Sequence, residues 1–166
     1  MCILTFKCQI GYYHLSDIEP RVLDDTDFES YKGVFSGAWS RILHAVGNAE
    51  RYGLGVLIGE QHLAILQRQG TFISHLIQDL HAAPGAQNKD AHSGTGTGEI
   101  HMWTKTNMAR TVMALQVLTT HFANRPNVVG IELINEPANN NQVQGWYEST
   151  LATLRKISPD IPLYIR

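Results

Sequence analysis

The hydrophobic residues of the chain fall into blocks that alternate between helix and strand patterns. Three segments carry apolar residues at helical spacing: 34–52, a segment that opens near Thr104, and a segment that Asn141 would cap. Short and almost continuous apolar stretches, typical of strands, lie at 3–13, 53–58, 127–134 and 161–165. We therefore predict the order strand, helix, strand, helix, strand, helix, strand, with a loop over 16–32.

The strands predict an α/β fold, because they are apolar throughout and this is typical of parallel strands covered by helices. A barrel and an open doubly wound sheet both fit. The run Gly94-x-Gly96-x-Gly98 lies in the middle of a loop after a later strand, whereas a dinucleotide-binding turn follows the first strand, so a nucleotide fold is disfavoured. Polar residues gather instead where strands end, at His81 and at 135–136, which favours a (β/α) barrel.

Composition excludes several other classes. Thirteen basic and fifteen acidic residues give a net charge of -2 without a basic run, so no nucleic-acid partner is indicated and a neutral ligand such as a sugar fits better. Cys2 and Cys8 lack the spacing of a zinc site or a disulfide framework. No apolar run reaches the roughly 20 residues of a membrane span. The opening "MCILTFKCQ" is too short for a signal peptide, so we expect no export signal in this chain.

Two motifs resemble glycoside hydrolase family five. "GIELINEP", residues 130–137, is similar to the acid/base strand of that family, and "DLHAAPGAQNKDAHSG", residues 79–94, resembles the third-strand motif of its fungal exo-β-1,3-glucanase branch. The resemblance implies a (β/α)8 TIM barrel, of which 1–166 would hold roughly strands two to five with their helices. The chain would then be an incomplete catalytic domain. The family's nucleophile comes from strand seven, so we assign no residue to that role and expect this chain to be inactive.

The resemblance also implies roles for particular residues. Glu136 would be the general acid/base of a retaining glycoside hydrolase, and Asn135 would bind the sugar 2-hydroxyl. His81 would bind another hydroxyl of the same sugar. The remaining implied binding residues line the cleft in relatives, and they are Asn88, Asp90, His92 and Tyr13. The implied substrate is a β-glucan, the implied location is extracellular or in the cell wall, and the implied chemistry needs no metal and no cofactor.

Glu136 follows a buried strand, where an unpaired carboxylate is costly. The simplest interpretation is that Glu136 is a turn residue exposed to solvent. In the family's motif, partial desolvation would raise the pKa of this carboxyl group, so that it could deliver a proton near neutral pH. Glu132 lies four residues earlier on the same strand, at roughly 13 Å. Because a retaining pair is about 5 to 5.5 Å apart, Glu132 is predicted to be a buried structural charge.

Two functional alternatives stay open. The first is a β-1,4-glucanase or mannanase of the same family, because the Asn-Glu-Pro element is shared. The second is a fragment that binds carbohydrate without catalysis. The interval 59–78 separates "GVLI" from "DLHAAPG", which form one strand in the family's pattern, and a buried parallel strand does not tolerate an insertion. We predict that this interval is a non-native insertion, a translated intron, with a genuine surface insertion as the alternative.

Overall fold

A single parallel sheet organises the chain. The computed structural model describes residues 8–53, 76–93 and 98–165. Within these ranges the sheet has the order β1-β2-β3-β4 and all three strand pairs are parallel. The strands are β1 (Cys8–Gly11), β2 (Leu76–Ala82), β3 (Val128–Glu132) and β4 (Leu163–Tyr164).

The strand order bears on the two α/β architectures that the sequence left open. Each strand lies beside the strand that follows it in the chain, whereas a doubly wound sheet reverses its order at a switch point. The sequential order is that of consecutive units of a (β/α) barrel. Among the described residues the sheet is open, with β1 and β4 at its edges and no closed barrel.

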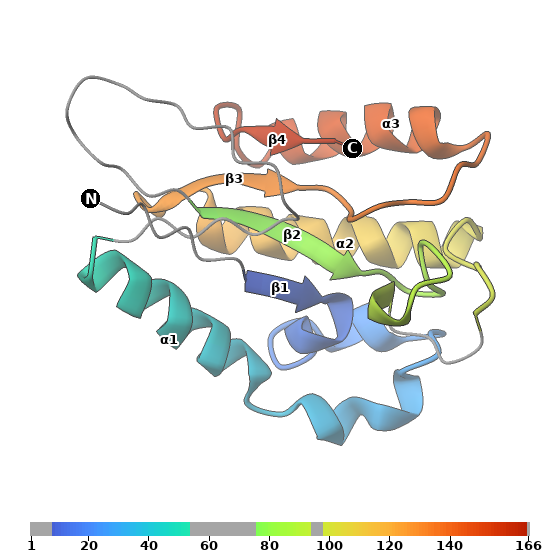
Figure 1. Ribbon diagram of the computed structural model, residues 1–166, viewed down its shortest axis with the longest axis horizontal. Coiled ribbons are helices and arrows are strands. Elements are labelled where there is room, and N and C mark those ends of the chain that lie inside the picture. The colour runs from blue at the N-terminus through green and yellow to red at the C-terminus, as the bar shows by residue number, and fades with distance from the viewer. Residues whose placement is uncertain (1–7, 54–75, 94–97, 166) are drawn as a thin grey trace.

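In the described parts of the chain, three α-helices connect the strands. Figure 1 shows α2 running behind β2 and β3, and α3 lying beside β4. The helices are α1 (Ala38–Arg51), α2 (Lys105–Phe122) and α3 (Val143–Arg155). Short 3-10 helices fill part of the connections: η1 (Tyr12–Leu15), η2 (Pro20–Leu23), η3 (Glu29–Phe35) and η4 (Ala91–Ser93).

The predicted helices are confirmed, and their boundaries show why each begins and ends. α2 begins after Thr104, whose hydroxyl oxygen accepts a hydrogen bond from the Asn107 N–H at 3.2 Å. α1 begins at residue 38 because Gly37 has a left-handed φ of 81°. It stops before Gly53, which has a φ of 64° and donates to the carbonyl of Glu50.

Three local predictions were wrong. The strand expected over 3–13 ends at Gly11, because the chain turns there and the Gly11 N–H donates to Nδ1 of His14 at 3.0 Å. The loop expected over 16–32 contains 3-10 helices. The predicted cap Asn141 does not cap α3: the N-cap position is Gln142, where no side chain of the described residues makes a cap hydrogen bond, and Asn140 Oδ1 accepts from the Gln142 N–H at 2.8 Å in the turn before the helix.

The predicted strand at 53–58 and most of the interval 59–78 lie outside the described residues, and Gly53 itself is a turn residue. The end of that interval, however, is part of β2: Gln78 pairs with Cys8 of β1 and with Ile131 of β3. Residues 76–78 therefore fill three positions of the strand that leads to His81. The insertion hypothesis stays a prediction.

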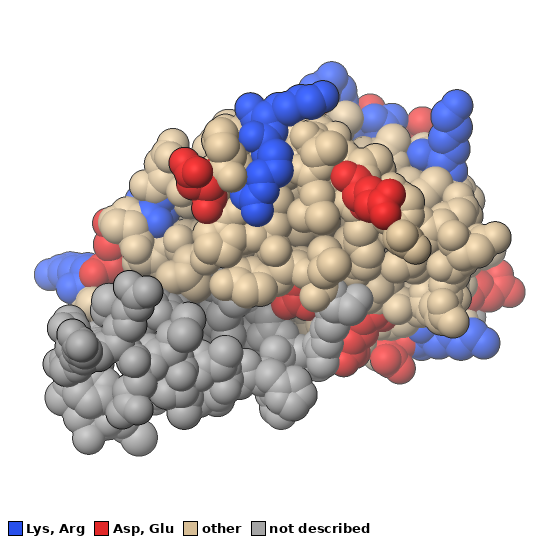
Figure 2. Space-filling model, turned by 90° about the horizontal axis from the view of Figure 1, so that it is seen from above, with Lys and Arg blue, Asp and Glu red and all other residues tan. Residues whose placement is uncertain are grey.

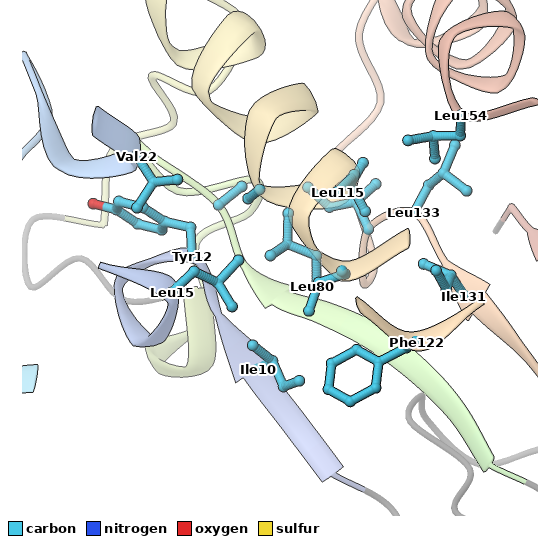
Figure 3. Close-up of a cluster of buried hydrophobic side chains, with 14 of the residues drawn as sticks. Ile10, Tyr12, Leu15, Val22, Leu80, Leu115, Phe122, Ile131, Leu133 and Leu154 are labelled. Carbon is cyan, nitrogen blue, oxygen red and sulfur yellow. The ribbon is translucent and has the colours of Figure 1, made fainter. Parts of the chain in front are cut away.

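The hydrophobic core lies between the sheet and the helices. Ile10 pairs with Leu80, and both side chains are fully buried. Figure 3 shows these two side chains in one cluster with Leu115 and Phe122 of α2. α1 joins the core through Trp39, whose ring centroid lies 5.4 Å from that of Phe122. The core fixes β1 and β2 against α2 and so determines where the loops after these strands emerge.

The strand pair β3 and β4 approaches closely at Gly130. A methyl group there would lie 2.7 Å from the carbonyl oxygen of Pro162 and would also meet the ring of Tyr164. No side chain fits such a gap, so the glycine is required by close packing.

The charged residues are scattered over the face shown in Figure 2, where acidic and basic side chains are interspersed among uncharged residues. This pattern agrees with the small net charge of -2. No helix in the described ranges has the length and hydrophobicity needed to cross a membrane.

Candidate active site

Two loops meet at the carboxyl end of the sheet, one after β2 and one after β3 (Figure 1). The Asn135 N–H donates to the carbonyl of Leu80 at 3.2 Å, which continues the pairing of the two strands. Further on, the Ala138 N–H donates to the carbonyl of Gln87 at 2.9 Å. These two bonds hold the loops against each other at both ends.

The loop after β2 is built around the buried side chain of Gln87. Its Oε1 accepts from the Ala83 N–H at 3.1 Å, and its Nε2 donates to the carbonyl of His81 at 2.7 Å. The side chain is fully buried. One amide thus satisfies two backbone groups of a tight turn, as buried backbone groups require.

Sequence reasoning missed Gln87. A weak signal was available, because Gln87 is an uncharged polar residue directly after the turn sequence "APGA" in a segment that follows a buried strand. Side chains at such positions often satisfy turn backbone groups. The sequence does not reveal that this one would be fully buried.

Asn88 links the two loops through its side chain. Its Nδ2 donates to the carbonyl of Glu136 at 2.9 Å, and its Oδ1 accepts from the Asp90 N–H at 2.9 Å. The same Nδ2 lies 3.1 Å from Nε2 of His92. Asn88 is 7% exposed. Its position is therefore set by three partners on two different loops.

His92 contacts a second amide and a second imidazole. Its Nε2 lies 3.1 Å from Nδ2 of Asn135, and its ring centroid lies 4.7 Å from that of His81. Asn135 is fully buried, and its Oδ1 has no hydrogen-bond partner among the residues that the structure describes. A buried acceptor without a partner is costly, unless a ligand supplies the donor.

Glu136 follows Asn135 and is half-buried. Its φ of 45° places it in the left-handed region, which costs a residue other than glycine about 1 to 3 kcal/mol. The bond from Asn88 to its carbonyl is one contact that holds this conformation. Strained residues of this kind often occur at functional sites, where the surrounding structure supports them.

Six residues predicted for the site are thus close together at one end of the sheet. We call them the strand-end cluster, and its members are His81, Asn88, Asp90, His92, Asn135 and Glu136. Glu132 is not one of them: it is 8% exposed and belongs to β3 itself, where it pairs in register with Asp79 and Tyr164.

Tyr13 packs against neighbouring aromatic side chains. Its ring stacks on Phe35 with centroids 4.6 Å apart, and it makes edge or tilted contacts with Tyr12, His14 and Phe28. Burial raises the pKa of Tyr13. The ring face on Phe35 is therefore occupied by packing, and a sugar-stacking role for Tyr13 stays a prediction.

Three members of the cluster have the side chains of metal ligands. Asp90, His92 and Glu136 each bring one potential ligand atom within 4.8 Å of the others. Nε2 of His92 already faces two amide nitrogens, so a metal ion bound there would displace both contacts. Exposed carboxylates near a histidine are common without a metal, and we assign no metal site to the described residues.

The carboxyl end of a parallel α/β sheet thus brings a carboxyl group, amides and imidazoles together in one candidate site. Comparison with known proteins gives the relatives. The chain is 27% identical over 172 residues to an uncharacterized glycosyl hydrolase of Saccharomyces cerevisiae, covering 98% of this chain and 30% of that protein. It is 27% identical over 162 residues to glucan 1,3-beta-glucosidase 3 of Schizosaccharomyces pombe, covering 97% of this chain and 29% of that protein.

A shorter alignment is more similar. The chain is 47% identical over 62 residues to a glucan 1,3-beta-glucosidase of Blumeria graminis, covering 37% of this chain and 14% of that protein. The homologues of the chain are thus fungal glycosyl hydrolases of the glucan 1,3-beta-glucosidase group. The chain spans about 30% of the length of the first two relatives. No family model matches it.

Solved structures support the fold. The chain superposes on the crystal structure of AoRut with a TM-score of 0.60 at 15% identity, covering 98% of this chain and 42% of that one. For rutinosidase from Aspergillus niger the TM-score is 0.56 at 15% identity, with 98% and 43% covered. At this identity the similarity shows a shared fold alone.

Proposed function

We propose that the strand-end cluster is the acid/base part of a retaining glycosidase site that acts on β-1,3-glucan, and that the described sheet is a segment of a (β/α)8 barrel. The observation that carries the proposal is Asn135: a fully buried amide oxygen without a partner among the described residues lies next to Glu136, a strained and half-buried carboxyl group. A sugar hydroxyl would supply the missing donor.

The proposed chemistry assigns one role to each group. A nucleophilic carboxylate attacks the sugar carbon while the bond from that carbon to the glycosidic oxygen breaks, and the Glu136 carboxyl group gives its proton to that oxygen. The Glu136 carboxylate then removes a proton from a water that attacks the same carbon and releases the nucleophile. Asn135 and His81 hold hydroxyls of the sugar. Asn88, which donates to the backbone of Glu136, keeps the acid in place.

The substrate class rests on the relatives, two of which are named as glucan 1,3-beta-glucosidases. Fungal cell-wall glucan is the corresponding polymer. A β-1,4-glucan would fit the same catalytic groups, so linkage has to be tested directly.

A retaining reaction also needs a nucleophilic carboxylate about 5 to 5.5 Å from the acid. Asp90 comes within 4.8 Å of Glu136, but it is exposed and lies on the loop that carries Asn88. We expect it to act in binding, and we expect the 166-residue chain alone not to hydrolyse laminarin.

The experiment is a titration of the isotope-labelled chain with laminaribiose and, separately, with cellobiose, followed by NMR. We expect laminaribiose to shift the resonances of Asn135, Glu136 and His81, and to do so at lower concentration than cellobiose. Glu136→Gln should change this binding, while Glu148→Gln on the exposed side of α3 is the matched control. Absence of sugar binding, or binding away from the cluster, would refute the proposal.

A further inference from the structure

His92 lies between two side-chain amides of the strand-end cluster, and this position has a consequence for the ligand. We infer that His92 is a positioning residue: its neutral ring, protonated on Nδ1, orients the amide of Asn135 so that Oδ1 is the atom left for the ligand. The site would then accept a hydrogen bond from its ligand at this point. The identity of that ligand as a sugar rests on the proposed function.

The orientation of Asn88 is the first step. Its Oδ1 accepts from a backbone N–H, that of Asp90, and its Nδ2 donates to a backbone carbonyl, that of Glu136. If the oxygen and nitrogen of this amide were exchanged, the oxygen would face the carbonyl of Glu136, acceptor against acceptor. The nitrogen would face the N–H of Asp90, donor against donor. The two backbone contacts therefore fix which end of the amide is oxygen and which is nitrogen.

The tautomer of His92 follows from the fixed amide. The Asn88 atom that lies 3.1 Å from Nε2 of His92 is a nitrogen that carries hydrogen. A protonated Nε2 would point its own hydrogen at that N–H group. Nε2 must therefore accept, and the ring proton belongs on Nδ1. A doubly protonated ring would also carry a hydrogen on Nε2, so the same contact excludes it.

The orientation of Asn135 is the last step. Because Nε2 of His92 accepts, the Asn135 atom 3.1 Å away must be the donor Nδ2 and not the oxygen. The N–H groups of both amides then donate to the one lone pair of His92 Nε2, as a three-centre hydrogen bond. Oδ1 of Asn135 then points away from His92, fully buried and without a partner among the described residues. A ligand group that meets it must carry a donor, as a hydroxyl does and an ether or fluorine does not.

The first test is a long-range proton–nitrogen NMR spectrum of the histidine rings at neutral pH, recorded on the labelled chain without sugar. We expect His92 to carry its proton on Nδ1. His101 is an internal control, since its Nε2 lies 3.0 Å from the carboxylate of Glu99 and should carry the proton there. Comparison with His92→Gln assigns the signal. A proton on Nε2 of His92, in either the neutral or the charged ring, would overturn the inference.

The second test compares His92→Gln, which offers an oxygen acceptor, with His92→Leu, which offers none. Each is titrated with laminaribiose and with analogues in which single hydroxyls are replaced by fluorine. We expect the native chain and His92→Gln to prefer one hydroxyl over fluorine by about tenfold, and His92→Leu to lose this preference. An unchanged preference in His92→Leu would overturn the positioning role. The tautomer measurement needs no sugar, so failure to bind any sugar would count against the proposed function alone.

Discussion

Replacing Gln87 by alanine should destabilise the chain although the change lies in a loop. The substitution removes an amide that bonds to two backbone groups, the N–H of Ala83 and the carbonyl of His81. Ala83 is fully buried and His81 is 7% exposed, so water does not readily replace the lost partners.

The expected size follows from these two contacts. A buried backbone group left without a partner costs about 1 to 3 kcal/mol, so two of them cost about 2 to 6 kcal/mol. Because the space left by the side chain lets solvent approach in part, we expect about 2 to 4 kcal/mol in the free energy of unfolding. With a slope of about 2 kcal/mol per molar urea, the middle of the usual range, the unfolding midpoint should fall by about 1 to 2 M.

The assay is urea unfolding followed by circular dichroism. Gln144→Ala is the matched control, since Gln144 is exposed on α3 and bonds only to the side chain of Glu148 among its described partners. We expect the control to change stability by less than about 0.5 kcal/mol. If Gln87→Ala behaves like the control, the two bonds do not hold the loop and the reasoning is wrong.

Three further predictions concern other parts of the chain. Gly130→Ala should lower the free energy of unfolding by about 1 to 3 kcal/mol, measured by thermal unfolding, because its methyl group meets Pro162. Gly145→Ala in α3 is the control: its methyl group meets nothing within 4 Å, so the change should be neutral or stabilising. Burial raises the pKa of Tyr12 above its ordinary value of 10.0, so above pH 10 the folded chain keeps a proton that the unfolded chain releases. The free energy of unfolding should therefore fall as pH rises above 10, by up to about 1.4 kcal/mol per pH unit. Tyr12→Phe should flatten this slope. Transcript sequencing should find messages in which the codon of Ile58 is joined to that of Asp79.

Each of these has a result that would contradict it. Equal melting temperatures for the two glycine variants would show that β3 and β4 can separate at no cost. An alkaline unfolding curve that Tyr12→Phe leaves unchanged would remove Tyr12 as the responsible group. Abundant messages that retain codons 59–78, with no such junction, would establish the interval as genuine; residues 76–78 already pair in β2.

The elements that the sequence predicted well are those with long periodic patterns. α2 has an apolar stripe over five turns and a threonine cap, and both signals agree on its start. The turns of the N-terminal segment were missed because each spans only a few residues, too short for a period to show. The N-cap of α3 was placed one residue early, at Asn141 instead of Gln142, since three asparagines in a row give the same local signal and only the backbone geometry selects where the helix begins.

The grouping of the site was predictable for a topological reason. Parallel strands bring their carboxyl ends to one edge, so residues after β2 and β3 had to meet. The contacts within the cluster were not predictable. His92 contacts both Asn88 and Asn135. These contacts depend on how two loops from distant parts of the chain fold over each other, and the local sequence does not encode that arrangement.

The bonds that join the loops after β2 and β3 also bear on how this end of the sheet opens. The Ala138 N–H and the Asn88 side chain both cross from one loop to the other, so neither loop can lift without breaking contacts of its partner. We expect the two loops to form one cooperative unit in hydrogen exchange, with the amides of Ala138 and Asp90 opening at the same free energy. Opening this end of the sheet would then move both loops together.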